Sequence, residues 1–460
     1  MKKSLHPKAL QLIAVLSLLI LHFVLVNVAF GQQTWKAGTA RLNITPTKPL
    51  MMAGYSSRTH PAEETLSDLW VKVLVLEDAS GSKAVVVTSD LLGFPKKLSD
   101  QIRGQLETIL GLSKAQIILN SSHTHSGPIL GEALQDIYPL NPERQLAINQ
   151  YTENLEKEIV HAVVNASRSM EPVKIFTQQG VSRFQVNRRN NSEGTLDEQR
   201  ELKGPNDYAV PVFKVVDAQG GTKAILFGYA CHATVLNGYQ WSGDYPGFAQ
   251  SELEKAFPGT TALFFQGAGG DQNPLPRTQI SLAKKYGWEL ANAVKAVIAE
   301  PMDELTPELR TSYTELKLKI SPLPKAEIEK MSKGSESYIT KWAKRMLAKA
   351  ESNQALPDFY PYPVQAWKLG EQGIVILGGE LTVGYAIEIK KLLGKKTVVM
   401  GYSNDVMSYI PTATVLKEGG YEGYSSQMAY GLPGVWSGQI ETDILDGVKT
   451  TAKAAGLSPK

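Results

Sequence analysis

Three of the seven histidines in the chain lie where β-strands are expected to end. His123 and His125 form a His-x-His pair after the apolar run 116–120, and His232 follows the run 225–229. Side chains of extended chain alternate with a period of two, so both imidazoles of the pair point to the same side. Imidazoles combined with a carboxylate form the ligand set that zinc favours in catalytic sites. The pattern therefore favours a metal site over structural histidines, although a His-x-His pair by itself is a weak signal.

Two further polar residues follow expected strands, and the first of them, a carboxylate, completes such a ligand set. Glu380 comes after the run 374–377, and Tyr409 comes after the run 398–400. Ligands of open α/β sheets bind beyond the carboxyl ends of the strands. We therefore expect these segments to converge with the histidines on one site. Zinc bound there would lower the pKa of a water molecule from about 15.7 to about 7.

Other chemistries have weaker support in the sequence. The glycine-dense turn 267–270 lacks the spaced third glycine of a dinucleotide-binding loop, and we interpret it as a tight turn that lets Asp271 and Asn273 reach the site. Asp271 could equally accept a hydrogen bond from a ligand histidine. Cys231, the only cysteine, is expected to be a buried core thiol rather than a catalytic thiolate. No nucleophile elbow, phosphate-binding loop or H-E-x-x-H motif occurs.

The elements that must position these residues alternate between short β-branched runs and amphipathic patterns. Strands are expected at the runs above and also at 71–76, 84–89 and 262–265. Helices are expected at 95–110, 146–166, 248–257, 282–298 and 382–393, with a polar helix at 325–350 that leaves the core. This alternation predicts a layered α/β domain with its active site at the carboxyl ends of the strands.

Composition and the N-terminus bear on partners and location. The chain has 460 residues, of which 43% are hydrophobic. It has 48 basic and 45 acidic side chains, and because these charges nearly balance we expect no nucleic-acid partner. Three lysines precede the apolar run 10–30, which ends in Ala29-Phe30-Gly31. This is typical of a signal peptide over residues 1–31 and predicts a periplasmic or extracellular protein. An uncleaved N-terminal membrane anchor is the alternative, because the run is about long enough to span a bilayer.

Several short motifs, taken in order from Gly38 to about Gly431, resemble the neutral (non-lysosomal) ceramidase family. They are Gly38-Thr-Ala-Arg-Leu-Asn-Ile-Thr-Pro46, Thr88-Ser-Asp90-Leu-Leu, Ser122-His-Thr-His-Ser-Gly-Pro128, the segment around His232, Gly379-Glu380-Leu-Thr382, Asn404 to Thr412, and Gly420-Tyr-Glu-Gly423. The resemblance implies a sandwich with a mixed β-sheet core flanked by helices. It also implies a single catalytic domain over 32–460, with a helical excursion at 325–355 and without the family's C-terminal Ig-like domain.

The resemblance further implies roles for individual residues. The family binds one catalytic zinc through two histidines, a glutamate and a tyrosine, and the matching residues are His123, His232, Glu380 and Tyr409. His125 is expected in the same pocket, where it assists proton transfer. Arg188 is expected to orient an amide carbonyl or an oxyanion; a solvated loop arginine is the alternative interpretation, and Arg189 a substitute for it.

The chain departs from the family at a serine that the family needs for activity. The family's Gly-Asp-Val-Ser-Pro motif is Gly270-Asp-Gln-Asn273-Pro274 here. Asn273 has no hydroxyl group to act as a nucleophile, but its amide can still donate a hydrogen bond to a carbonyl or an oxyanion. We therefore expect attack by zinc-activated water, with developing charge stabilised by Arg188, Asn273 or Tyr409.

Together these observations predict an exported hydrolase with one Zn²⁺ per chain. It would cleave the N-acyl amide bond of a ceramide-like lipid into a fatty acid and a sphingoid base. The expected partner is an amide-bearing lipid or another small molecule, with contact to a membrane surface. The alternatives are a zinc hydrolase of another amide or ester, a non-catalytic lipid- or glycan-binding relative, and a structural envelope protein.

Overall fold

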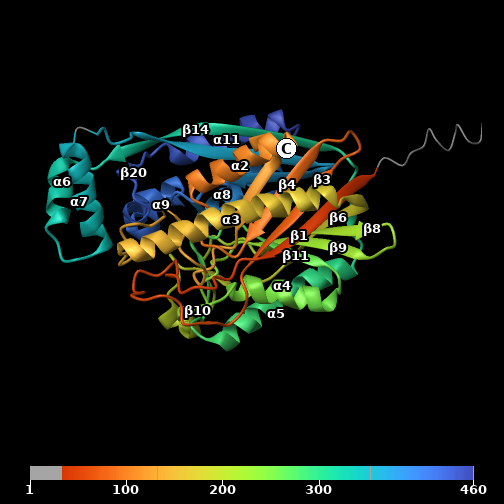
Figure 1. Ribbon diagram of the computed structural model, residues 1–460, viewed down its shortest axis with the longest axis horizontal. Helices are drawn as coiled ribbons and strands as arrows, with labels where there is room; N and C mark the ends of the chain where they lie inside the picture. Colours follow the sequence, from red (N-terminus) through yellow and green to blue (C-terminus); the bar gives the residue numbers. More distant parts are fainter. Residues whose placement is uncertain (1–33, 132, 353, 459–460) are drawn as a thin grey trace, which may run out of the picture.

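Two β-sheets lie face to face, and helices cover the outer face of each sheet (Figure 1). The structure is a computed structural model that describes residues 34–131, 133–352 and 354–458. The expected signal segment, residues 1–31, therefore lies outside the described residues. Within the described part of the chain, no helix is both long and apolar enough to cross a membrane.

The larger sheet is mixed and has the strand order β11-β9-β8-β6-β1-β3-β4-β5, with β13 paired to β6. The pairs β4–β5 and β9–β11 are parallel, and the other pairs are antiparallel. The sheet curls until its edge strand β11 contacts β3, β4 and β5. Its strands are β1 (Trp35–Asn43), β3 (Trp70–Glu77), β4 (Lys83–Ser89), β5 (Ile117–Ser121), β6 (Glu171–Val181), β8 (Ala209–Asp217), β9 (Thr222–Tyr229), β11 (Thr261–Gln266) and β13 (Asp303–Glu304).

The smaller sheet has the order β18-β16-β15-β14-β20. Its strands are β14 (Leu309–Pro322), β15 (Phe359–Leu369), β16 (Gln372–Leu377), β18 (Val398–Met400) and β20 (Gly434–Trp436). Three pairs of very short strands connect the loops at the ends of the sheets. They are β2 (Glu64–Thr65) with β10 (Gln240–Trp241), β7 (Gln185–Asn187) with β12 (Gln272–Pro274), and β17 (Glu380–Leu381) with β19 (Tyr409–Ile410).

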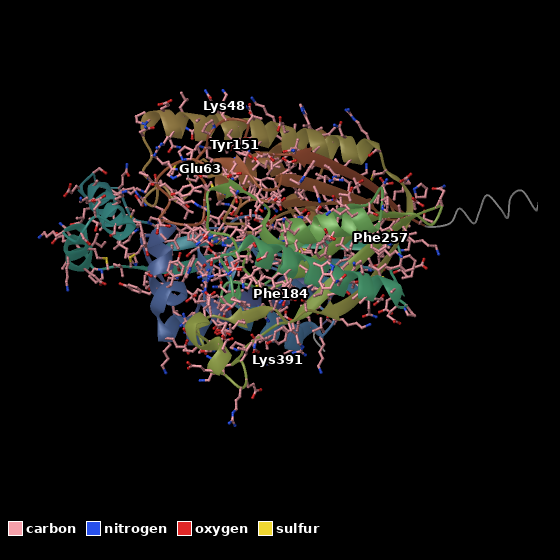
Figure 2. The ribbon with its side chains drawn as sticks, turned by 90° about the horizontal axis from the view of Figure 1, so that it is seen from below. Lys48, Glu63, Tyr151, Phe184, Phe257 and Lys391 are labelled. Carbon is pink, nitrogen blue, oxygen red and sulfur yellow. The ribbon has the colours of Figure 1, made fainter. Side chains whose placement is uncertain are left out.

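Helices α2 (Lys96–Leu110) and α3 (Pro142–Arg168) cover one half of the larger sheet, and α4 (Asp244–Ala256) and α5 (Ile280–Ala299) cover the other half. Helices α8 (Val383–Leu393) and α11 (Ile440–Ala454) cover the smaller sheet. In Figure 2, Tyr151 of α3 and Lys391 of α8 lie on opposite sides of the molecule, as this layering requires. The short helices are α9 (Ala413–Glu418), α10 (Ser426–Ala429), the 3₁₀ turns Lys114–Gln116 and Glu193–Glu198, and the π turn Tyr421–Ser425.

Alternation along the strands explains how one sheet serves two cores. On β3, Val73 and Val75 pack with α2 and α3, whereas the intervening Leu74 and Leu76 pack against the smaller sheet. Successive strand residues point to opposite faces, so a strand buried on both faces is apolar throughout. The expected layered α/β sandwich with a mixed β-sheet core is confirmed.

The prediction of a single polar helix over 325–350 is wrong. The segment forms two helices, α6 (Lys325–Ser332) and α7 (Tyr338–Glu351), which protrude together at one end of the molecule (Figure 1). Ser337 begins α7 by accepting a hydrogen bond from the Thr340 backbone N–H, a preferred way to start a helix. One face of α7 is buried, because Trp342 is buried and its Nε1 donates to the carbonyl of Leu432.

Candidate metal centre

Four side chains from separate segments meet at the carboxyl ends of strands from both sheets. His123 follows β5 and His232 follows β9, whereas Glu380 begins β17 just after β16. The Nε2 atoms of His123 and His232 each lie 3.1 Å from Oε2 of Glu380. Tyr409 is the parallel β-partner of Glu380, and its hydroxyl lies 3.1 Å from Nε2 of His232. The structure thus brings together the four residues expected to hold a metal.

The backbone fixes the orientation of both imidazoles. Nδ1 of His123 lies 2.6 Å from the carbonyl oxygen of Leu92, and Nδ1 of His232 lies 2.6 Å from that of Gly269. A carbonyl oxygen only accepts hydrogen bonds, so each Nδ1 carries the proton. In the neutral imidazole the Nε2 atom then has a lone pair, which is the state required of a metal ligand.

Burial and neighbouring charges shift the pKa values of two of these groups. Burial disfavours an ionised Glu380, but His123 and His232 hold the pKa of this carboxyl well below its ordinary value. Burial and the nearby Arg188 lower the pKa of His232 to about 4. With the Nδ1 proton of each imidazole held by a backbone carbonyl, two Nε2 atoms and a carboxylate oxygen face one another in a buried space. A cation among such atoms would offset the cost of burying them.

The spacing of these atoms fits zinc. Zinc lies about 2.0–2.2 Å from nitrogen and oxygen ligands, so neighbouring ligand atoms of a tetrahedral site are about 3.3 Å apart. The three distances of 3.1 Å given above are close to that value. The nitrogens of His123, His125 and His232 all lie within 4.8 Å of one another. The donor set, its charge and its spacing therefore fit a bound divalent metal.

His125 enters the site beside this ligand set. Its Nε2 lies 3.1 Å from Nε2 of His123, and its Nδ1 is buried without a hydrogen-bond partner. Burial, together with the other two imidazoles, lowers the pKa of His125 well below its ordinary value. The ring fits only because residue 54 is glycine: a Cβ there would lie 2.4 Å from Cγ of His125. His123 itself has a φ of 60°, a left-handed conformation that non-glycine residues rarely adopt outside functional sites.

The Arg188 guanidinium connects Tyr409 to Asn273 and Glu422. Its Nη2 donates to the Tyr409 hydroxyl at 3.0 Å, its Nη1 to Oδ1 of Asn273 at 3.1 Å, and its Nε to Glu422 at 2.7 Å. The short pair β7–β12 sets this arrangement, because Asn273 pairs with Val186 and the Arg188 N–H donates to the carbonyl of residue 271. Since Oδ1 of Asn273 is engaged by the guanidinium, its amide nitrogen is the group left to donate.

A cleft of about 840 Å³ opens over these residues. His125, Arg188, Asn273 and Tyr409 all line it, and the rim is formed mainly by polar side chains from residues 189–199. Its volume lies in the usual range for small-molecule sites. The cleft therefore gives a substrate access to Tyr409, His125 and the Arg188 guanidinium.

Comparison with known proteins agrees with this geometry. The family described as neutral/alkaline non-lysosomal ceramidase, N-terminal, matches residues 35–278. The chain belongs to this family. Neutral ceramidase A of Dictyostelium discoideum is 28% identical over 226 residues, which is 45% of this chain and 31% of that protein. Neutral ceramidase B of the same organism is 26% identical over 271 residues, or 54% of this chain and 36% of that protein. The alignments thus span about a third of each relative.

Solved structures with the same fold include the neutral ceramidase of Pseudomonas aeruginosa, with a TM-score of 0.70 and 18% identity. A structure described as ceramidase complexed with C2 has the same TM-score and 19% identity. Each similarity covers 93% of this chain and 76% of the other. At these identities the similarity concerns the fold, which is the ceramidase fold.

Two further sequence predictions for this ceramidase-family chain can be compared with the site. Arg189 does not replace Arg188: its guanidinium donates to Glu418 and Glu422 and has no contact with Tyr409. The prediction that Asp271 accepts from a ligand histidine is wrong. Its carboxylate accepts instead from the Val383 N–H at the start of α8 and from the Asn187 amide. The carbonyl of Gly269 is nearer to the ring and takes that role.

Two tyrosines that contact Glu380 were not among the predicted site residues. The Tyr430 hydroxyl donates to Oε1 at 2.6 Å, and the Tyr402 hydroxyl donates to Oε2 at 3.4 Å. Tyr402 lies in the strand-end segment before Tyr409, and this position could have indicated a role in the site. Tyr430 directly follows α10, where no sequence pattern points to the site. Cys231 is buried, as expected, and burial raises its pKa well above the ordinary value for a thiol.

Proposed function

We propose that this chain is a zinc-dependent hydrolase that cleaves the N-acyl amide bond of a ceramide-like lipid. The observation that carries the proposal is the gathering of lone pairs on His123, His232 and Glu380 beside a cleft that also exposes a guanidinium and an amide donor. Membership of the ceramidase family supports the amide as the bond cleaved. The lysines and apolar run before residue 31 support export and, with a lipid substrate, contact with a membrane surface.

The metal would be held by His123, His232, Glu380 and Tyr409. When bound, zinc supplies a Lewis acid that lowers the pKa of water to about 7. The chain's own residues would orient the substrate: Arg188 and the Asn273 amide donate hydrogen bonds to the carbonyl oxygen, where negative charge develops during attack. These donors are held in place before the reaction by Glu422 and by the β7–β12 pair.

His125 would move the proton. It is neutral at physiological pH because burial lowers its pKa, and it lies against the ligand set. It would accept a proton from the attacking water and deliver it to the nitrogen that leaves as the amine. The products are a carboxylic acid and an amine, and no serine hydroxyl is required, which is consistent with asparagine at position 273.

A more polar amide or ester is the second candidate substrate. Polar side chains dominate the rim of the cleft, among them Asn190, Asn191, Ser192, Thr195 and Gln199. Such a rim offers hydrogen bonds to a head group rather than apolar contact to a long chain.

Metal content and turnover, measured together, test the proposal. Purified protein should contain about one zinc per chain by elemental analysis and should release fatty acid from a fluorescent short-chain ceramide in a chelator-sensitive way. His232→Ala should lose both metal and turnover, whereas His161→Ala, an exposed histidine of α3, should keep both. Zinc without ceramide cleavage would direct the search to polar amides and esters. Absence of zinc after reconstitution, or full turnover by His232→Ala, would refute the proposal.

A further inference from the structure

A second large cleft, of about 650 Å³, lies apart from the metal centre and shares no lining residue with the first. It is formed by α4 and α5, which lie side by side along the larger sheet (Figure 1), and by the ends of β1 and β3. Figure 2 shows α4 running toward its end near Phe257. Nothing in the proposed hydrolysis uses this cleft.

Ion pairs between α4 and the sheet form one part of the cleft lining. The Lys72 side chain is 2% exposed, and its ammonium group donates to Glu254 at 2.7 Å and to the carbonyl of Ala262 at 2.9 Å. Arg41 donates to the other oxygen of Glu254 at 2.8 Å, and its guanidinium lies 4.9 Å from the centre of the Trp70 ring. Burying an ammonium group is unfavourable unless it is paired, so these groups are a built arrangement rather than a solvated surface.

A buried carboxyl and an amide form another part of the lining. Asp90 is 2% exposed and accepts hydrogen bonds from the Trp70 N–H at 2.9 Å and from the Gln250 amide at 3.4 Å. Burial raises the pKa of Asp90 to about 6. The cleft therefore offers hydrogen-bond donors and acceptors next to each other, and it opens onto groups that the fold keeps largely out of water.

Charge and aromatic content narrow the choice of ligand. Four basic and four acidic side chains line the cleft, so their formal charges cancel and no simple ion is favoured: Arg41, Lys72, Lys255 and Lys284 against Asp68, Asp90, Glu252 and Glu254. Trp288 of α5 also lines it and leaves 56% of its surface exposed, an unusual state for so large an aromatic side chain.

We propose that this cleft binds a neutral saccharide. The hydroxyl groups of a sugar both donate and accept, as the mixed lining requires, while the C–H face of a pyranose ring stacks on an exposed indole such as that of Trp288. An uncharged ligand fits a lining whose charges cancel, and the volume suits one or a few sugar rings. The site is separate from the metal centre, so a negative result for saccharide binding would not affect the proposed hydrolysis.

Saturation-transfer NMR on the full protein tests this site, with methyl β-glucopyranoside, methyl β-galactopyranoside and N-acetylglucosamine as separate probes. At least one probe should give saturable binding, and Trp288→Ala should weaken it at least tenfold. Trp288→Tyr, which keeps an aromatic face, should retain most of the binding. Phe359→Ala removes another exposed aromatic outside the cleft and should bind like the parent protein.

Three results would overturn the proposal. No saturable binding of any of the three probes would remove the ligand class. Equal binding by Trp288→Ala and the parent protein would place the sugar elsewhere. Tighter binding of glucuronate or glucosamine than of the neutral pyranosides would show that the cleft selects charge.

Discussion

Glu418 and Glu422 both bind Arg189, but only Glu422 also reaches Arg188. One carboxylate oxygen of Glu422 accepts a hydrogen bond from Nε of Arg188. This contact fixes the orientation of the guanidinium plane, and therefore the direction of the two N–H groups that donate to Asn273 and Tyr409. A fork of fixed geometry transmits orientation in a way that a lysine could not. Glu422 is thus a positioning residue.

Glu422→Gln should therefore lower kcat about 10- to 100-fold, the usual effect of losing a group that orients an active-site residue. Zinc content should remain that of the parent protein, because the Glu422 side chain binds Arg188 and Arg189 and none of the four expected ligands. Steady-state kinetics and elemental analysis measure the two effects. Glu418→Gln is the matched control and should leave kcat nearly unchanged. Equal losses in both variants would show that Arg188 holds its orientation without Glu422.

Asp405 is a buried carboxyl whose ionisation opposes folding. It is 4% exposed, accepts from the Tyr360 hydroxyl at 2.6 Å, and burial raises its pKa to about 7. Folding thus tightens proton binding at this group, so its contribution to stability is fully present below about pH 4 and is lost as pH rises toward 7.

Asp405→Asn removes this titration while keeping an acceptor for Tyr360. The free energy of unfolding of the variant, relative to the parent, should rise by up to about 1.4 kcal/mol per pH unit between about pH 4 and pH 7. Urea denaturation at a series of pH values measures the difference. Asp446→Asn, at an exposed position on α11, is the matched control for replacing a carboxylate by an amide at the surface. A flat profile for Asp405→Asn would contradict the argument.

At the scale of elements, close contact between a helix and a strand depends on a missing side chain. Gly38 of β1 lies so near α3 that a Cβ would be 1.8 Å from the carbonyl oxygen of Ala166. That atom belongs to the helix backbone and cannot rotate away, so any other residue must push α3 off the sheet. Gly104 of α2, by contrast, has no atom within 4 Å of a Cβ.

Gly38→Ala should lower the free energy of unfolding by about 1–3 kcal/mol through overpacking. Gly104→Ala should raise it by about 0.5–1 kcal/mol, because alanine favours the helix over the unfolded chain. Chemical denaturation of both variants tests the pair of opposite signs. A destabilisation of the same size at both positions would show that packing against α3 is not the cause.

At the scale of the whole molecule, the metal site joins the two sheets. His123 and His232 follow strands of the larger sheet, whereas Glu380 follows a strand of the smaller one. A cation held by these residues would stabilise the packing of one sheet on the other, and its removal would leave buried polar atoms facing one another. Metal binding is therefore expected to be part of global stability.

Chelation should lower the melting temperature of the full protein, and zinc should restore it. At a free zinc concentration of 100 times Kd, the added stability is about 2.7 kcal/mol. Differential scanning fluorimetry with and without chelator measures the shift. His232→Ala should show no shift, since it lacks a ligand. If neither chelator nor zinc changed the melting temperature of the parent protein, a contribution of the metal to stability would be refuted.

Local patterns predicted much of this protein. Helices such as α2 can be predicted because their apolar residues recur with a period near 3.6 within a short segment. In α2 this period places Leu98, Ile102 and Leu106 on one buried face. Buried strands such as β3 and β9 follow from continuous β-branched and apolar runs. Beyond these elements, the order of motifs placed the metal-ligand candidates, and the absence of a hydroxyl at Asn273 followed from residue type alone.

Long strands with polar or proline-rich sequences escaped prediction. β14 alternates lysine with leucine and isoleucine, and β15 contains two prolines, so neither has the composition of a core strand. The pairing of β14 with β15 along eleven registered positions, from Leu309 with Leu369 to Lys319 with Phe359, stabilises both. Such pairing joins residues far apart in the chain, which no local pattern reports.

Residue identities alone show which side chains stand at the strand ends, and hence that candidate metal ligands and an amide donor are present. Which atoms face the site depends on the fold. The carbonyls of Leu92 and Gly269 fix the tautomers of His123 and His232, and Asp271 turns to α8 instead. The reason is physical: the backbone carbonyl of any residue can accept a hydrogen bond, so the path of the backbone sets the partner of each imidazole, and residue identity does not reveal it.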